Sequence, residues 1–167
     1  METYSASLNI FAKIMTGFVF LLAIFGVGLS LFLDPWYGGL VLSVLMTITI
    51  VFTYIYSVQS YQITDEALVI KRPFSKFDKI ISFTEIESVR LPDKAEFKWT
   101  IRTAGNGGLF GYSGYFMNNK LGAFRMFASN GKNKILIVLK NEHEKIVISP
   151  DDVEMLDVLQ KHLKKQA

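Results

Sequence analysis

Residues 14–33 are IMTGFVFLLAIFGVGLSLFL, an uncharged and largely apolar stretch of 20 positions. As a helix, this stretch rises about 30 Å, which is the thickness of the hydrocarbon core of a bilayer. A second uncharged stretch follows a turn at Asp34 and Pro35 and is also long enough to cross. We therefore predict that residues 1–60 form a two-helix transmembrane hairpin, with spans at about residues 14–33 and 38–58.

A cleaved signal peptide is the alternative interpretation of the first stretch, because Lys13 precedes it. However, the stretch is longer than the apolar region of most signal peptides, and no typical cleavage site separates it from the second stretch. We therefore expect both helices to be retained. Gly17, Gly26 and Gly28 are expected to let the second helix approach the first closely.

Basic residues near the two stretches predict the orientation of the hairpin. Residues 34–37, which connect the stretches, contain no Lys or Arg, whereas Lys13 lies on one flank and Lys71, Arg72 and Lys76 lie beyond the other. Basic residues are enriched on the cytoplasmic side of membrane proteins. We therefore expect a multi-pass protein of the cell (inner) membrane, with the lipid bilayer as its surroundings and both termini in the cytoplasm.

The remaining part of the chain, residues 61–167, has the composition of a water-exposed domain, because charged residues recur every few positions from Asp65 onward. The net charge of the whole chain is +3, and its basic residues are interspersed with acidic ones. Such a weak surplus argues against a surface for nucleic acid. The absence of cysteine excludes disulfide bonds, a thiol nucleophile and a cysteine-based metal site.

Short alternating runs in this part predict a mainly-β domain of about seven antiparallel strands arranged as a meander. The runs fall at residues 61–63, 68–70, 79–83, 86–91, 97–102, 122–128, 134–140 and 145–148. A C-terminal α-helix is predicted to begin with Ser149 as its N-cap and Pro150 at its first position. Its apolar stripe would close one end of the sheet, and it consists of Val153, Leu156, Leu159 and Leu163.

The stretch from Thr103 to Leu159 resembles the membrane-tethered bacterial pleckstrin-homology (PH) domain proteins. It contains the segments GNGGLFGYSGYF, LGAFRMFASNGKNKILIVL and IVISPDD. The resemblance implies a PH-like roll of two sheets closed by the terminal helix. It implies no catalytic residue and no cofactor.

A glycine-rich segment begins at Gly105 and is the first candidate site. Its composition predicts a long connection between strands, and its aromatic side chains could instead contact the membrane or a partner. A phosphate-binding loop is disfavoured, because no Lys-Ser or Lys-Thr pair follows the glycines and no helix begins there. The possible interaction residues are Gly105, Gly107, Gly108, Leu109, Phe110, Gly111, Tyr112, Gly114, Tyr115 and Phe116.

A second candidate site is a basic cluster near the first strands, where PH domains that bind phosphoinositides place basic residues. Its members are Lys71, Arg72, Lys76 and Lys79. The cluster either contacts lipid headgroups or forms an ordinary solvated face. His143 and His162 have no nucleophile or paired carboxylate at a recognisable spacing, so no catalytic site and no metal site are predicted.

These features predict a non-enzymatic, membrane-anchored interaction module that presents its PH-like domain to a protein partner of unknown identity. One alternative is a sensor of anionic lipid headgroups that uses the Lys71–Lys79 cluster. A second is a small transport-associated subunit, which is disfavoured because neither span carries an ionisable residue at its centre. Homo-oligomerisation is compatible with the sequence but is not required by it.

Overall fold

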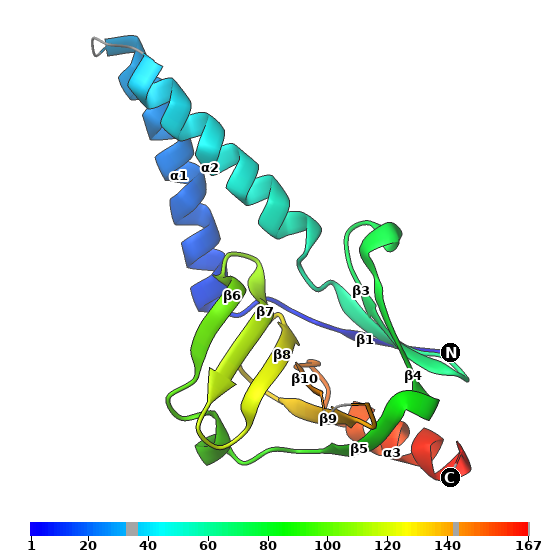
Figure 1. The fold of residues 1–167 in the computed structure, drawn as a ribbon. Helices are drawn as coiled ribbons and strands as arrows, with labels where there is room; N and C mark the ends of the chain where they lie inside the picture. Colours follow the sequence, from blue (N-terminus) through cyan, green and yellow to red (C-terminus); the bar gives the residue numbers. More distant parts are fainter. Residues whose placement is uncertain (33–36, 142–143, 167) are drawn as a thin grey trace.

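The computed structural model describes residues 1–32, 37–141 and 144–166. Two long helices project from a β-rich body that consists of two sheets and a C-terminal helix (Figure 1). The helices converge where α1 ends and α2 begins, and they diverge toward the β-rich body. The structure thus has the predicted class, with two apolar helices followed by a mainly-β domain and a terminal helix.

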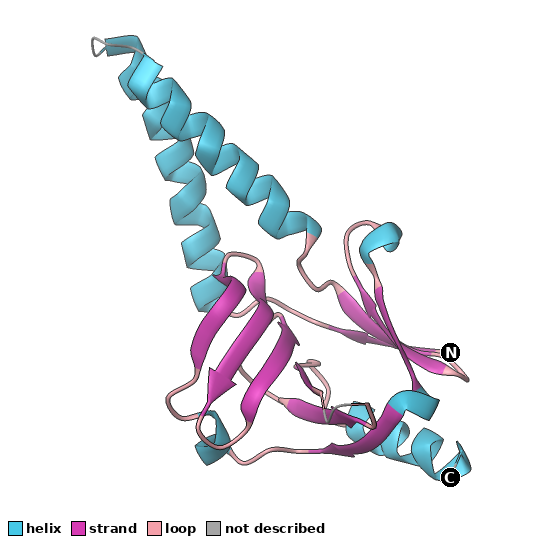
Figure 2. Cartoon of the chain, in the orientation of Figure 1, coloured by secondary structure: helices cyan, strands magenta, loops and turns pink. Residues whose placement is uncertain are grey.

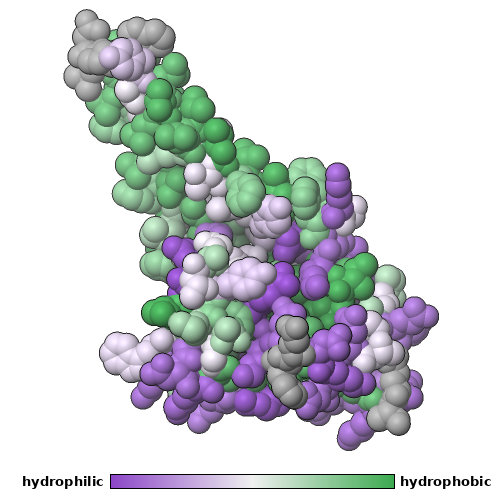
Figure 3. Space-filling view, viewed as in Figure 1, coloured by the Kyte–Doolittle hydropathy of each residue, from purple (hydrophilic) through white to green (hydrophobic). Residues whose placement is uncertain are grey.

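The two helices are α1 (Ile10–Phe32) and α2 (Tyr37–Ile55), and both are strongly apolar. Only 11% of the most apolar stretch of 18 residues in each helix is buried, whereas a core helix of a soluble protein is mostly buried. Figure 3 shows their apolar side chains as a continuous surface that ends at the polar β domain. Both helices are therefore long and apolar enough to cross a membrane. The predicted turn residues Asp34 and Pro35 lie outside the described residues.

Small residues bring α1 and α2 together. A Cβ atom on Gly39 would lie 2.5 Å from the carbonyl oxygen of Gly26, so only glycine allows this approach. Across the same interface, the hydroxyl of Ser43 donates a hydrogen bond of 3.1 Å to the carbonyl of Ala23. The prediction of close packing is confirmed for Gly26. It is wrong for Gly17 and Gly28, where an added Cβ would meet nothing within 4 Å.

The first sheet has four antiparallel strands in the order β1-β2-β3-β4. Its strands are β1 (Glu2–Ser5), β2 (Ser60–Ile63), β3 (Ala67–Lys71) and β4 (Lys79–Ser82). β1 has no counterpart among the strands predicted from the sequence, and it pairs with β2 along its whole length. Since α1 and α2 lie between β1 and β2 in the sequence, the chain leaves the sheet and returns to it at neighbouring strands.

The second sheet has six strands in the order β5-β9-β10-β8-β7-β6. Its strands are β5 (Ile86–Arg90), β6 (Ile101–Gly108), β7 (Gly111–Asn118), β8 (Gly122–Ala128), β9 (Ile135–Leu139) and β10 (Lys145–Ile148). Within the described residues, every pairing in this sheet is antiparallel except that of β10 with β8. The predicted all-antiparallel meander is wrong at this position, because β10 inserts between β8 and β9.

The glycine-rich segment is not a loop but the hairpin of β6 and β7 (Figure 2). Gly105 pairs with Gly114 and Gly108 pairs with Gly111, and all four have positive φ angles between 101° and 141°. A Cβ on Gly105 would overlap the carbonyl oxygen of Ser113 on the opposite strand. The predicted long connection is therefore wrong. Gly105 and Gly114 allow the close approach of two strands, and Gly108 and Gly111 flank the short turn between them.

The terminal helix α3 (Met155–Gln166) begins later than predicted. Ser149 is fully buried, and its N–H donates to the hydroxyl of Tyr61. The carboxylate of Asp151 accepts hydrogen bonds from the N–H of Ser7, at 2.9 and 3.1 Å. These polar residues therefore bind the first sheet and the N-terminal segment, and the predicted cap at Ser149 is wrong.

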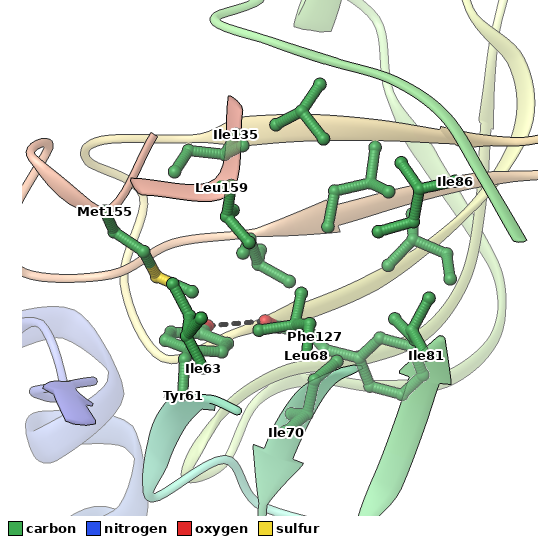
Figure 4. Packing of buried hydrophobic residues seen from close by; sticks show 14 of the residues in the cluster. Tyr61, Ile63, Leu68, Ile70, Ile81, Ile86, Phe127, Ile135, Met155 and Leu159 are labelled. Carbon is green, nitrogen blue, oxygen red and sulfur yellow. Dashed lines mark hydrogen bonds between the residues drawn. The ribbon is translucent and has the colours of Figure 1, made fainter. Parts of the chain in front are cut away.

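The main core lies between the two sheets and is covered by α3, from which Met155 and Leu159 are fully buried (Figure 4). One polar group crosses this core, because the Tyr61 hydroxyl on β2 donates a 2.7 Å hydrogen bond to the carbonyl of Phe127 on β8. The predicted closing helix is confirmed in this role. Val153 is an exception, because it precedes the helix and is exposed.

Candidate functional site at the junction of α2 and the β domain

The β6–β7 turn fixes the β domain against both long helices. The N–H of Phe110 in this turn donates a 3.2 Å hydrogen bond to the hydroxyl of Thr16 on α1. The Phe110 ring also packs edge-on against Tyr54 of α2, with 5.4 Å between ring centroids. A third contact joins Tyr56 to Phe77, whose ring centroids are 5.5 Å apart. The end of α2 is thereby held by the β6–β7 turn of the second sheet and by Phe77, which lies between β3 and β4 of the first sheet.

The predicted interaction residues are distributed over different parts of this hairpin. Leu109 and Phe110 form the turn, and the side-chain amide of Asn106 donates to the carbonyl of Leu109. Tyr112 and Phe116 pack against a second apolar cluster in the β domain, so they are structural. The glycines shape the backbone of the hairpin, and these are Gly105, Gly107, Gly108, Gly111 and Gly114. Tyr115 points to the exposed face of the sheet.

A pocket of about 650 Å³ lies between the end of α2 and the face of strands β6, β7 and β8. One wall consists of α2 side chains. The other walls carry three arginines together with aromatic rings. The lining side chains most relevant to its chemistry are Thr49, Phe52, Thr53, Tyr56, Arg72, Leu109, Tyr115, Arg125 and Phe127.

Arg72 follows β3 and turns its guanidinium toward aromatic rings. Its Cζ atom lies 5.1 Å from the centroid of Tyr56 and 5.5 Å from that of Phe127. Its Nε atom is buried and has no hydrogen-bond partner. Burial lowers the pKa of Arg72, the Tyr56 phenol opposes this effect, and the positive charge of Arg125 lowers the pKa further. The pocket therefore holds a guanidinium whose hydrogen-bonding capacity is unfilled.

Arg125 on β8 reaches the same aromatic ring from another direction. Its Cζ atom lies 5.2 Å from the centroid of Phe127 and also 5.2 Å from that of Tyr115. Its Nη1 atom is 3.3 Å from a carboxylate oxygen of Glu144. Phe127 thus contacts both guanidiniums, which combine positive charge with flat, weakly hydrated surfaces.

The predicted basic cluster does not converge on one point. Lys71 forms an ion pair of 2.8 Å with Asp78, and the N–H of Arg72 donates to the same carboxylate. Lys76 is exposed on the short helix η1 (Ser75–Phe77), and Lys79 is half-buried at the start of β4. Among these four residues, Arg72 is the one that lines the pocket.

Sequence reasoning did not identify Arg125 as a pocket residue. The signal was present, because Arg125 interrupts the otherwise apolar strand sequence FRMF. Arg72 is 53 positions away in the sequence, and the fold brings the two arginines together at the ring of Phe127. Arg102 also lines the pocket, but its guanidinium lies against Gly107.

A second surface extends from Tyr115 along the exposed face of β6 and β7. Trp99 is 89% exposed, and Ile101, Tyr115 and Met117 are also exposed. Ile101 and Met117 are paired across the strands, and Tyr115 lies two positions from Met117 and hence on the same face. We call these four residues the outer β6–β7 patch.

The segment that leads to this patch is anchored by a short helix, η3 (Lys94–Phe97), which has a capping box formed by Asp93 and Glu96. Arg90 holds the Glu96 carboxylate with two hydrogen bonds, of 2.8 and 2.7 Å. These bonds, together with one from the N–H of Asp93, lower the pKa of Glu96 to about 2. Trp99 then follows with a φ angle of +58°, which directs the chain into β6.

No group of three or more potential metal ligands occurs among the described residues. The ring of His162 on α3 stacks on Phe83, with 5.2 Å between centroids, and its Nδ1 atom lies 2.9 Å from the carbonyl of Val158. His162 therefore has structural contacts. His143 lies outside the described residues.

The fold and these surfaces define a membrane-associated module, in which two apolar helices carry a PH-like β domain. Residues 59–163 match the model of the bacterial PH domain family, so the chain belongs to that family. No curated protein and no solved structure matches the chain. PH-like domains are in general non-catalytic binding modules.

Proposed function

We propose that the protein is a non-catalytic interaction module of the cell membrane, with α1 and α2 crossing the bilayer and the β domain lying on the cytoplasmic surface. The exposed apolar surface of both helices supports the membrane-spanning role. The basic residues support the orientation, because Lys13 and Lys76 are exposed near the domain side of the helices.

The strand β1 supports retention of α1 in the working protein. It precedes α1 and pairs with β2 through four residue pairs, from Glu2 with Ile63 to Ser5 with Ser60. Cleavage after α1 would remove this edge of the first sheet. Because the β domain holds the hairpin through both β1 and β2, and also through the Phe110 contacts, it is presented in a fixed position rather than on a flexible linker.

The outer β6–β7 patch is the proposed surface for a protein partner. The observation that carries this proposal is Trp99, which is 89% exposed and lies two positions before Ile101, which is also exposed. Aromatic residues and Met are enriched at protein interfaces, and exposed apolar patches mark interaction sites. Strand β6 also lies at the edge of its sheet, where a partner strand can add.

The proposed orientation predicts the labelling of single cysteines, since the natural chain contains none. In intact cells, a membrane-impermeant maleimide is expected to label Gly38→Cys, at the start of α2, but not Lys161→Cys on α3. An added Cβ at Gly38 meets nothing within 4 Å, and Lys161 is exposed, so both changes are compatible with the fold. After permeabilisation both cysteines should react. Labelling of Lys161→Cys in intact cells would overturn the orientation.

The proposed partner surface predicts site-specific photo-crosslinking in cells. A photoreactive amino acid at Ile101 is expected to yield a discrete crosslinked protein, because this position lies in the outer β6–β7 patch. The same amino acid at Lys161, which is exposed but outside the patch, should yield none. Trp99→Ser should also abolish the crosslink formed at Ile101. Equal crosslinking from both positions, or none from Ile101, would contradict the proposal.

A further inference from the structure

We infer that the pocket lined by Arg72 and Arg125 binds the phosphate of an anionic phospholipid taken from the adjoining leaflet. The inference rests on the proposed placement of the β domain at the membrane surface. The pocket shares Tyr115 with the outer β6–β7 patch, but it lies against α2 and its proposed ligand is not a protein.

The charges in the pocket favour an anion. Three arginines line it, namely Arg72, Arg102 and Arg125, whereas no carboxylate does so among the described lining residues. Asp78 binds Lys71 and the backbone N–H of Arg72. Glu144 pairs with Arg125 at 3.3 Å and offsets part of its charge, but it does not line the pocket. Arg72 and Arg125 also repel each other, which contributes to the lowered pKa of Arg72. A bound anion would relieve that repulsion.

The hydrogen-bonding groups favour a phosphate. The Nε atom of Arg72 is buried without a partner, which is unfavourable for a charged group unless a ligand supplies an acceptor. A guanidinium presents its donors as a planar fork that matches two oxygens of one phosphate. Tyr56, Phe127 and Tyr115 hold the two guanidiniums in place by stacking, so little freedom would be lost on binding.

The remaining wall identifies a lipid as the source of that phosphate. It consists of α2 side chains from the apolar, membrane-spanning helix, among which Thr49 and Phe52 are exposed. An acyl chain or glycerol backbone can lie along this wall while the phosphate reaches the arginines. Free phosphate would leave the apolar wall uncovered. The site therefore has a charged part that matches a phosphate and an apolar part that matches the rest of a phospholipid.

The test is native mass spectrometry of the full-length chain in detergent, titrated with phosphatidylglycerol. The unmodified protein is expected to retain this lipid in preference to phosphatidylcholine. The double variant Arg72→Gln/Arg125→Gln should lose affinity by about tenfold or more, since it removes both charge-assisted contacts. The charge-matched control Lys76→Gln/Lys79→Gln should bind within about twofold of the unmodified protein, because both lysines lie outside the pocket.

Three outcomes would overturn the inference. Equal loss in the two double variants would indicate general attraction to basic residues, and no retention of phosphatidylglycerol by the unmodified protein would remove the site. Binding of inorganic phosphate that competes fully with the lipid, with no preference for the lipid, would assign the pocket to a soluble anion. Circular dichroism must show that the Arg72→Gln/Arg125→Gln variant is folded, and Arg72→Lys/Arg125→Lys offers a second variant that keeps the charge. None of these outcomes alters the cysteine labelling that tests the orientation.

Discussion

Replacing Tyr61 with Phe is expected to lower the free energy of unfolding of the β domain by about 2–4 kcal/mol. The Tyr61 side chain is fully buried, and its hydroxyl donates to the carbonyl of Phe127 and accepts from the N–H of Ser149, at 2.7 and 3.0 Å. Removing one oxygen therefore takes a hydrogen-bond partner from two buried backbone groups, and a buried group left unsatisfied costs about 1–3 kcal/mol. Chemical denaturation of the full-length chain in detergent, followed by circular dichroism, measures the loss.

The matched control is Tyr115→Phe, which removes the same atom from an exposed residue. It is expected to change the stability by less than about 0.5 kcal/mol. If the two variants unfold at the same denaturant concentration, the Tyr61 hydroxyl does not join the sheets in the way described. This comparison keeps the number of lost hydroxyl groups constant, so it isolates the effect of burial.

The titration of Tyr61 gives the same experiment a pH dependence. Burial raises the pKa of the Tyr61 phenol above its ordinary value of 10, so the folded protein keeps it neutral. Below pH 10 both the folded and the unfolded chains carry the proton. Above it, the unfolded chain releases the proton first, and the stability of the unmodified protein falls. The difference in the free energy of unfolding between the unmodified protein and Tyr61→Phe should therefore decrease as the pH rises above about 10.

Hydrophobic length and alternation were sufficient to predict the main elements of this fold. The two helices contain 23 and 19 residues, and their apolar character is uninterrupted. The strands β3 and β9 likewise show up in the sequence, because buried β-branched and leucine side chains follow one another there. These signals are local, since each depends on neighbours within a few positions.

The features that the sequence did not reveal depend on distant partners. The strand β1 is short and mostly exposed, and it is recognisable only through its pairing with β2, which begins 58 positions after it. Ser149 and Asp151 have the residue types of a helix start, but the Ser149 hydroxyl accepts from the N–H of Asn130 and the Asp151 carboxylate accepts from the N–H of Ser7. A local capping signal was thus overridden by tertiary hydrogen bonds.

The candidate pocket could be predicted only in part, because its residues are also distant from one another in the sequence. The sequence indicated Arg72 as a basic residue beside a strand. Its place in a pocket depends on Arg125, Phe127 and Tyr56, which come from other elements. The prediction grouped Arg72 with its sequence neighbours Lys71 and Lys76. The fold instead separates them, because Lys71 turns to Asp78 while Arg72 turns to the aromatic rings.

The insertion of the helical hairpin between β1 and β2 also bears on how the module works. A domain tied to the membrane through one strand could rotate about a single connection, whereas this domain is held through two paired strands. The Phe110 contacts with Thr16 and Tyr54 add a third point of attachment. On the proposed placement at the membrane, the pocket and the outer β6–β7 patch would therefore have a defined height and tilt above the bilayer.

Replacing Gly114 with Ala is expected to destabilise the β6–β7 hairpin by about 3–5 kcal/mol, because two unfavourable effects combine. Gly114 has a φ angle of +141°, which residues with side chains rarely adopt. Its Cβ atom would also overlap the carbonyl oxygen of Ala104 on the paired strand. Hydrogen exchange of the β6 and β7 amides measures the local effect, and chemical denaturation measures the global one.

Gly131→Ala provides the control for this change. Gly131 precedes β9, its φ angle is not in the positive region, and an added Cβ would meet nothing within 4 Å. The free energy of unfolding of this variant should differ from that of the unmodified protein by less than about 1 kcal/mol.

Gly114 also lines the pocket. Gly114→Ala should therefore weaken lipid binding and also reduce the protection of the hairpin amides from exchange, whereas Gly131→Ala should affect neither. Equal protection of the β6 and β7 amides in both variants would show that these glycines do not impose the close approach of the strands, and the segment would then be the flexible connection that its composition suggests.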